Sequence, residues 1–435
     1  MKDSASADGR EAAAAELVEL CQHAAERARD ARLAMALLPG AQRRDALRDI
    51  AAAILAHRAA ILEANAKDMA AAGGLADAMR ERLRLDASRV EAMSRAVAEV
   101  AEQVDPVGKV VEGRLLASGA RLEKRRIPIG VVLVIYESRP NVTSDAAAVC
   151  LKAGNAVLLK GGSEAAHSNR AIVAAIQSAL ERRGIAGAVQ FIDTTDRAAV
   201  TMLATMRGKI DLVIPRGGPG LIRAVTEAAT IPVVKHDAGN CHVYLDEHIE
   251  GLEQVAVRVT VNAKAQRPGV CNAAEKLLVH AAVAERVLPR VGAELVRAGV
   301  ELRCCPRSAA SLAKAGVPAK AAAESDWAEE YLALVMAVRV VDSLDEACAH
   351  IRRYGSQHTE AIITSSIAAA ERFTALLDSA SIMVNASTRL ADGGEYGLGA
   401  EVGISTDKLH ARGPMGAEDL TTFQWVLTGS GQVRG

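Results

Sequence analysis

The sequence predicts an α/β protein built around a doubly wound, mostly parallel sheet. Residues 130–136 form a nearly unbroken apolar run rich in β-branched side chains, which is typical of a strand buried on both faces of a parallel sheet. After it, short apolar segments alternate with helix-forming segments as far as Lys235, the pattern of repeated βαβ units. A second α/β stretch follows at about 240–385, and 435 residues are more than one hydrophobic core usually serves.

The N-terminal part is predicted to be helical, because residues from about 11 to 104 are rich in Ala, Arg, Glu and Leu, with a break near Gly73 and Gly74. Residues 107–124 alternate in short apolar and polar steps around two glycines, which predicts a hairpin. Further strands are expected at 155–160, 189–192, 210–215 and 231–235, with helices at 164–183, after Asp196, and at 221–229.

In the second stretch, Ser343 and Glu346 have the spacing of a capping box that opens a helix ending near Gly355. Residues 421–428 read as a last strand. The first ten residues have no apolar core, so we expect no signal peptide there.

Composition excludes several classes of protein. The net charge is −1 and aromatic residues make up 2%, which favours neither a nucleic-acid surface nor base stacking. No apolar run approaches the roughly 20 residues of a membrane span. The seven cysteines form no CxxC pair and no metal-ligand pattern, which fits a reducing compartment better than a disulfide framework. We therefore expect a cytoplasmic protein with no metal, membrane or nucleic-acid partner.

Two glycine clusters follow predicted strands. They are Gly161-Gly162 and Arg216-Gly217-Gly218, and both fall at carboxyl ends of strands, where doubly wound sheets bind ligands. Glycines there let backbone amides approach a pyrophosphate, and a helix N-terminus favours anions. Ordinary loop chemistry would explain either cluster alone, and no GxGxxG fingerprint is present. Together the two clusters favour a nucleotide.

Cys271 is the candidate nucleophile. It follows a Pro-Gly turn and has Lys264 and Arg267 close in sequence. Nearby positive charge lowers a thiol pKa and so favours the reactive thiolate. A buried structural cysteine is the alternative that this segment alone leaves open.

Several segments resemble the aldehyde dehydrogenase superfamily in their order along the chain. They are the strand at 130–136, Pro140-Asn141, residues 154–160, the turn at 216–218, and Cys271. Longer motifs resemble the gamma-glutamyl phosphate reductase family within it, and these lie at 136–142, 239–242, 262–268, 357–358 and 409–416. The resemblance covers nearly the whole chain after the first ten residues.

The resemblance implies residue roles. Cys271 matches the family nucleophile, and Asn141 matches the side chain that stabilises the developing oxyanion. The residues that match cofactor-binding positions are Lys160, Gly161, Ser163, Arg216, Gly217, Gly218 and Glu330. The substrate that the resemblance implies, gamma-glutamyl phosphate, carries an α-carboxylate and a phosphate, and both need cations. The candidates, which the sequence does not rank, are Arg139, Lys264, Arg267 and Arg389.

One departure from oxidising relatives is informative. Those enzymes carry a Glu that activates the water hydrolysing the thioester, whereas the matching stretch here begins at His236 and has no Glu. A reductase should lack that base. His236, His242 and His410 could do acid–base work, and a structural role for each stays open.

The implied activity is NADPH-dependent reduction of gamma-glutamyl phosphate through a Cys271 thioester. NADPH is expected over NADH because Ser163 stands where many NAD-using relatives carry an acid, and an acid repels the 2′-phosphate. Ser163 could equally cap the following helix. The alternatives are another acylating aldehyde dehydrogenase that uses a CoA thioester, and a non-catalytic nucleotide-binding protein on the same fold; phosphate dependence and turnover separate them.

The resemblance also implies a division into domains. Residues 1–105 and 127–238 would form a Rossmann-type cofactor domain, and residues 239–390 a catalytic domain carrying Cys271. Residues 106–126 and 413–435 would form a small β oligomerisation arm. A homodimer or homotetramer is expected from that arm, and glutamate kinase is the protein partner that the resemblance suggests.

Overall fold

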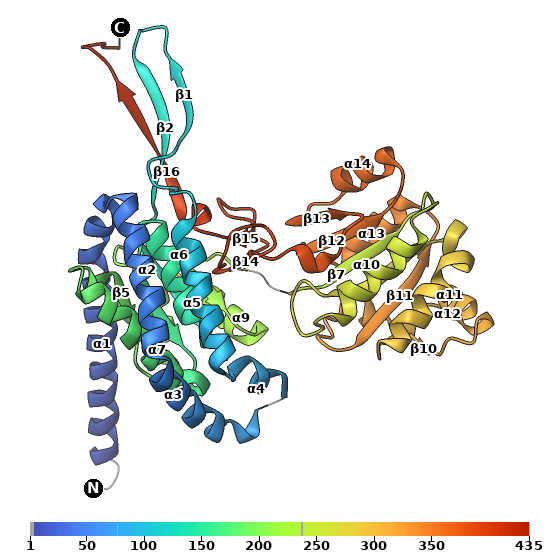
Figure 1. Ribbon diagram of the computed structural model, residues 1–435, viewed down its shortest axis with the longest axis horizontal. Helices are drawn as coiled ribbons and strands as arrows, with labels where there is room; N and C mark the ends of the chain where they lie inside the picture. The colour runs from blue at the N-terminus through green and yellow to red at the C-terminus, as the bar shows by residue number, and fades with distance from the viewer. Residues whose placement is uncertain (1–3, 76, 236–237, 435) are drawn as a thin grey trace.

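The computed structural model describes residues 4–75, 77–235 and 238–434. Two α/β lobes lie side by side, and a narrow three-stranded arm projects from one of them (Figure 1). We call them the N-terminal lobe, centred on strands β3–β6, and the C-terminal lobe, centred on β7–β13. None of the described helices combines the length and apolarity needed to cross a membrane.

The N-terminal lobe is built on a four-stranded parallel sheet in the order β5-β4-β3-β6. Its strands are β3 (Val131–Tyr136), β4 (Ala156–Gly161), β5 (Val189–Phe191) and β6 (Leu212–Arg216). The preceding helices are α1 (Ser4–Leu37), α2 (Gly40–Ala56), α3 (Arg58–Ala71), α4 (Asp77–Leu83) and α5 (Ala87–Glu102). The connecting helices are α6 (Asn141–Lys152), α7 (Ala166–Glu181), α8 (Ala198–Ala204) and α9 (Pro219–Ala228).

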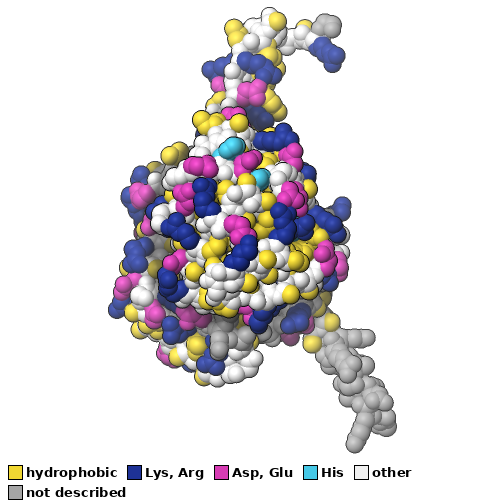
Figure 2. All heavy atoms as spheres, turned by 90° about the vertical axis from the view of Figure 1, so that its right-hand side faces the viewer, with side chains coloured by type: hydrophobic (Ala, Val, Ile, Leu, Met, Phe, Trp, Pro, Cys, Tyr) yellow, Lys and Arg dark blue, Asp and Glu magenta, His cyan; other side chains and the backbone are white. Residues whose placement is uncertain are grey.

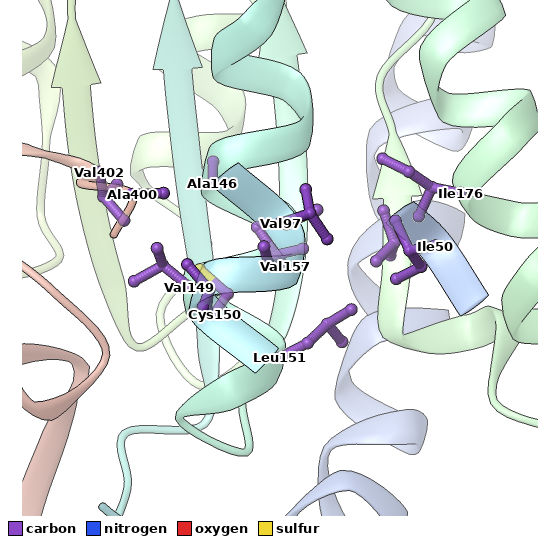
Figure 3. Close-up of a cluster of buried hydrophobic side chains, with 14 of the residues drawn as sticks. Ile50, Val97, Ala146, Val149, Cys150, Leu151, Val157, Ile176, Ala400 and Val402 are labelled. Carbon is purple, nitrogen blue, oxygen red and sulfur yellow. The ribbon is translucent and has the colours of Figure 1, made fainter. Parts of the chain in front are cut away.

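Strand β3 explains why the apolar run is unbroken. All six of its side chains are buried, and they alternate between two cores. Val132 and Val134 pack with α2, α5, α6 and α7, whereas Leu133 packs against α1 and α8. Figure 3 shows part of the first core, where Val157 of β4 lies near Val149 and Val97 of the helices.

The prediction of a strand at 231–235 is wrong, because this segment does not form a full strand. Only Val233 forms a bridge, to Val213 of β6. Pro232 lies within the segment and has no N–H to donate to a ladder. The carbonyl oxygen of Pro232 still accepts a hydrogen bond from the N–H of Val213 at 2.9 Å. Because Pro232 cannot donate in return, the pairing is limited to a single bridge.

The C-terminal lobe contains a seven-stranded parallel sheet in the order β10-β9-β11-β8-β7-β12-β13. Its strands are β7 (Cys241–Leu245), β8 (Ala274–His280), β9 (Glu301–Cys304), β10 (Lys320–Ala321), β11 (Val335–Val341), β12 (Thr359–Ile363) and β13 (Ser381–Val384). Its helices are α10 (Glu253–Ala265), α11 (Ala281–Arg297), α12 (Pro306–Lys314), α13 (Leu344–Tyr354) and α14 (Ile367–Leu376). The cap predicted at Ser343 is confirmed, since its hydroxyl accepts from the N–H of Glu346 at 3.1 Å.

After β13 the chain returns to the N-terminal lobe. Ala400, Val402 and Met415 join the core around α6, and Figure 3 shows Ala400 and Val402 beside Val149. Here β14 (Gly403–Ser405) pairs antiparallel with β15 (Gly413–Met415). Residues 413–415, expected in the arm, therefore lie outside it.

The arm is a three-stranded antiparallel sheet. It contains β1 (Val110–Leu115), β2 (Arg121–Pro128) and β16 (Thr421–Thr428), with β2 in the middle. The predicted hairpin and last strand are thus confirmed. The arm extends away from both lobes and displays a mixture of basic and apolar side chains (Figures 1 and 2).

Candidate active site

A cavity of about 280 Å³ is lined by residues of both lobes. From the N-terminal lobe come the segments that follow β3 and β6, at 137–139 and 216–219. From the C-terminal lobe comes the segment at 267–272, between α10 and β8. Residues at the carboxyl ends of the first lobe's strands therefore face the loop that carries Cys271.

Cys271 is held in this loop through its main chain. The thiol of Cys241 donates a hydrogen bond to the Cys271 carbonyl oxygen at 3.2 Å. A Cβ atom added at Gly239 would lie 1.9 Å from the same oxygen, so only glycine fits there. Cys271 itself is partly exposed and lines the cavity. Gly239 and Cys241, which begins β7, thus hold the main chain of the candidate nucleophile and leave its sulfur accessible.

Charged groups of both signs surround the thiol. Burial raises the pKa of Cys271, and the guanidinium groups of Arg216 and Arg139 lower it. The carboxylates of Glu401 and Glu330 act in the opposite direction. Arg216 and Glu401 also form an ion pair at 3.2 Å. The carboxylate of Glu401 therefore offsets part of the stabilisation that the Arg216 guanidinium gives to a Cys271 thiolate.

Asn141 begins α6 directly after Pro140. Its side-chain Nδ2 donates to Oδ2 of Asp145 at 2.8 Å, and Asn141 is not among the residues that line the described cavity. Since an amide nitrogen carries two hydrogens, one remains for another acceptor. Burial raises the pKa of Asp145 to about 7, while the hydrogen bond from Asn141 lowers it. Asp145 was not foreseen, and only its spacing of four residues from Asn141 could have indicated it.

Four of the predicted cofactor residues line the cavity: Arg216, Gly217, Gly218 and Glu330. The N–H of Gly218, at the start of α9, donates to the Glu137 carboxylate at 2.9 Å. The amide that a pyrophosphate would need thus already holds an anionic group. The Glu330 carboxylate accepts from the Gly239 N–H at 2.8 Å. Gly217, Gly218 and Glu330 thus lie in the same cavity as Cys271.

Lys160, Gly161 and Ser163 lie away from this cavity, at the end of β4 and the start of a 3₁₀ turn. The Lys160 ammonium donates to the Gly161 carbonyl oxygen at 2.9 Å, and burial lowers its pKa. Ser163 is exposed. The neighbouring Glu164 carboxylate accepts from the Ser138 hydroxyl at 2.9 Å, so that acid is already engaged.

The candidate substrate-binding cations separate into two groups. Arg139, Arg267 and Arg389 line the cavity. Lys264 does not, because its side chain is fully buried and pairs with Glu275 at 2.7 Å. The structure therefore does not bring Lys264 to the site. It adds Arg82, from α4, which lines the cavity and which no sequence pattern marked.

The histidines considered from sequence do not reach the cavity within the described residues. His242 is buried and its Nδ1 lies 2.9 Å from Oε2 of Glu360, and burial holds its pKa well below the usual value. His410 is exposed. His236 lies outside the described residues.

This fold and this cavity belong to a known class of enzyme. Residues 7–303 match the aldehyde dehydrogenase family, and the chain belongs to that family. Within it, the chain is 52% identical to a gamma-glutamyl phosphate reductase of Thermobifida fusca, covering 94% of this chain and 97% of the relative. It is 49% identical to the gamma-glutamyl phosphate reductase of Moorella thermoacetica, with the same shares covered.

A solved structure agrees. The crystal structure of gamma-glutamyl phosphate reductase from Thermotoga maritima has a TM-score of 0.91 and 42% identity, covering 95% of this chain and all of that one. The family expected from the motifs is thereby confirmed, together with the aldehyde dehydrogenase-like fold.

Proposed function

We propose that the protein reduces gamma-glutamyl phosphate to glutamate 5-semialdehyde and inorganic phosphate, with NADPH as reductant, as the second step of proline biosynthesis from glutamate. The observation that carries the proposal is the cavity itself. A partly exposed thiol, Cys271, lies there among several arginines, and the substrate is a doubly anionic acyl phosphate. The names of relatives that match 94% of the chain support the same substrate.

The proposed chemistry begins at the sulfur. The Cys271 thiolate attacks the acyl carbon, the bond between that carbon and the phosphate oxygen breaks, and phosphate leaves a thioester behind. Covalent catalysis divides a difficult reduction into easier steps. After reduction of the thioester, the carbon–sulfur bond breaks, the aldehyde departs and the thiolate is restored. The aldehyde then cyclises without the enzyme.

The surrounding residues have separate tasks in this scheme. Asn141, oriented by Asp145, would stabilise the oxyanion with its second N–H, since a preorganised donor acts on charge that develops in the transition state. Arg216 would favour the thiolate. Gly217, Gly218 and Glu330 would hold the coenzyme near Cys271, with Lys160, Gly161 and Ser163 at its adenosine end. The bound nicotinamide supplies the hydride.

We also propose that the arm joins a second copy of this chain. Phe423, Trp425 and Leu427 alternate along β16 and are 39%, 50% and 59% exposed. The outer edge of β16 has no strand beside it among the described residues, and an exposed apolar edge is a place where another chain can pair. A homodimer or a homotetramer would cover this surface.

The experiment that tests the activity is an assay in the reverse direction. Glutamate 5-semialdehyde and NADP are supplied with and without inorganic phosphate, and reduction of NADP is followed. We expect turnover that requires phosphate and that coenzyme A does not replace. Turnover with coenzyme A alone would identify an acylating enzyme of the CoA type, and absence of any turnover would indicate a non-catalytic protein.

A further inference from the structure

We propose that Arg82, with Arg139 and Arg267, forms the site that holds the phosphate group of the acyl phosphate and of the departing phosphate ion. The proposal rests on the function proposed above and specifies which cations serve which part of the substrate.

Arg82 reaches the nucleophile's loop from the other lobe. It lies near the end of α4, and its Nη2 donates to the carbonyl oxygen of Gly269 at 2.5 Å. Gly269 is two residues before Cys271. A guanidinium group has five N–H donors in a planar fork, so this one bond anchors Arg82 and leaves donors for a ligand.

These three arginines form no ion pair among the described residues, although the more distant carboxylates of Glu330 and Glu81 act on Arg82 and Arg267. Five arginines line the cavity: Arg82, Arg139, Arg216, Arg267 and Arg389. Arg216 pairs with Glu401, and Arg389 donates to the amide oxygen of Gln266 at 2.9 Å. Within the described parts of the chain, no ion pair joins Arg82, Arg139, Arg267 or Arg389 to an acidic side chain; Arg389 differs in being held by two amide oxygens, those of Gln266 and Asn272.

Besides Glu401, three carboxylates line the cavity, and each accepts a backbone hydrogen bond: Asp392 accepts from the Gly394 N–H at 3.0 Å. Glu137 accepts from the Gly218 N–H, and Glu330 accepts from the Gly239 N–H. Burial and the neighbouring charges of Arg216 and Arg82 lower the pKa of Arg139 to about 9. Burial, and the charge of Arg267, lower the pKa of Arg82. Like charges gathered beside one thiol are stabilised by an anion placed between them.

Phosphate is the anion that suits this position. In the acyl phosphate the phosphorus is one oxygen away from the carbon that Cys271 attacks, whereas the α-carboxylate lies at the far end of the glutamyl chain. The cations for the phosphate must therefore lie beside the sulfur, and Arg82, bonded to Gly269 two residues before Cys271, and Arg139 line the same cavity as Cys271. A phosphate group can accept from several guanidinium groups at once.

The test uses the full-length enzyme in the reverse direction, with inorganic phosphate varied at saturating semialdehyde and NADP. For Arg82→Gln we expect the KM for phosphate to rise by about 10- to 100-fold, the usual effect of losing hydrogen bonds to a charged group, while the KM for semialdehyde stays unchanged. The KM for phosphate of Arg82→Lys should lie between those of the unmodified enzyme and Arg82→Gln. Arg84→Gln is the control, because Arg84 is exposed and pairs with Glu81; its KM for phosphate should equal that of the unmodified enzyme.

A binding measurement complements the kinetics. Phosphate should slow the alkylation of Cys271 by iodoacetamide in the unmodified enzyme, and more weakly in Arg82→Lys. An unchanged phosphate KM in Arg82→Gln, or a rise confined to the semialdehyde KM, would overturn this assignment while leaving the proposed function intact. If the unmodified enzyme turns over without phosphate, the proposed function itself fails.

Discussion

The side-chain amide of Asn141 donates a hydrogen bond to the carboxyl group of Asp145, one turn further along α6, at 2.8 Å. Because burial raises the pKa of Asp145 to about 7, this contact fixes which end of the amide is the nitrogen above that pH, where the ionised carboxylate only accepts. The second N–H then has a defined direction. The pair thus acts as one unit if Asn141 stabilises an oxyanion.

We expect Asn141→Ala to lower kcat by roughly 10²- to 10³-fold, the usual loss when one oxyanion donor is removed. Labelling of Cys271 by iodoacetamide should persist, since the nucleophile itself is unaltered. Steady-state kinetics measure the effect. A variant impaired only in KM would indicate that Asn141 positions the substrate instead.

The ion pair between Arg216 and Glu401 gives two substitutions with opposite signs. Arg216 lowers the pKa of Cys271 and Glu401 raises it. Arg216→Gln should therefore raise the thiol pKa and move the pH profile of alkylation to higher pH. Glu401→Gln should lower it and move the profile to lower pH. Rates of iodoacetamide labelling between pH 6 and 10 measure both, and shifts of the same sign would contradict this electrostatic account.

We expect the cofactor preference to depend on Ser163. It is exposed at the start of the 3₁₀ turn that follows β4, and its acidic neighbour Glu164 is bound to Ser138. We expect a higher kcat/KM with NADPH than with NADH, and Ser163→Glu should shift the preference toward NADH because a carboxylate repels the 2′-phosphate. Ser163→Ala is the control for loss of the hydroxyl alone. Equal or better efficiency of the unmodified enzyme with NADH would refute the argument.

The arm provides a test of assembly. Trp425→Ser and Leu427→Ser should weaken self-association, because burial of each large apolar side chain contributes about 1.5–3 kcal/mol, equivalent to roughly tenfold or more in Kd. Val433→Ser is a matched control beyond the end of β16, where Val433 is 89% exposed. Sedimentation velocity measures the effect. If Trp425→Ser and Leu427→Ser sediment like the unmodified protein and like the Val433→Ser control, the arm is not the interface.

Local patterns predicted much of this protein correctly. The buried strand β3, the hairpin of the arm and the glycine turn after β6 each depend on a short run of residues with a strong backbone preference. The segment at 231–235 shows the limit, since its composition favours a strand while Pro232 restricts the pairing to one bridge. Pro232 is visible in the sequence, and its missing N–H argues against a full strand despite the apolar composition.

The parts of the site that depend on tertiary contacts could not be predicted. Lys264 is close to Cys271 in sequence, but α10 directs it into the core against Glu275. Arg82 is far from Cys271 in sequence, but α4 brings it to Gly269. Sequence proximity therefore included Lys264, which does not line the cavity, together with Arg267, which does, and it gave no indication of Arg82.

The central claim is that the substrate is carried on Cys271. The most direct measurement is peptide mass spectrometry after the enzyme is mixed with glutamate 5-semialdehyde and NADP in the absence of phosphate. We predict one γ-glutamyl group on the peptide containing Cys271, lost when phosphate is added, and none in Cys271→Ala. An adduct on another cysteine, or semialdehyde oxidation by Cys271→Ala, would contradict the account.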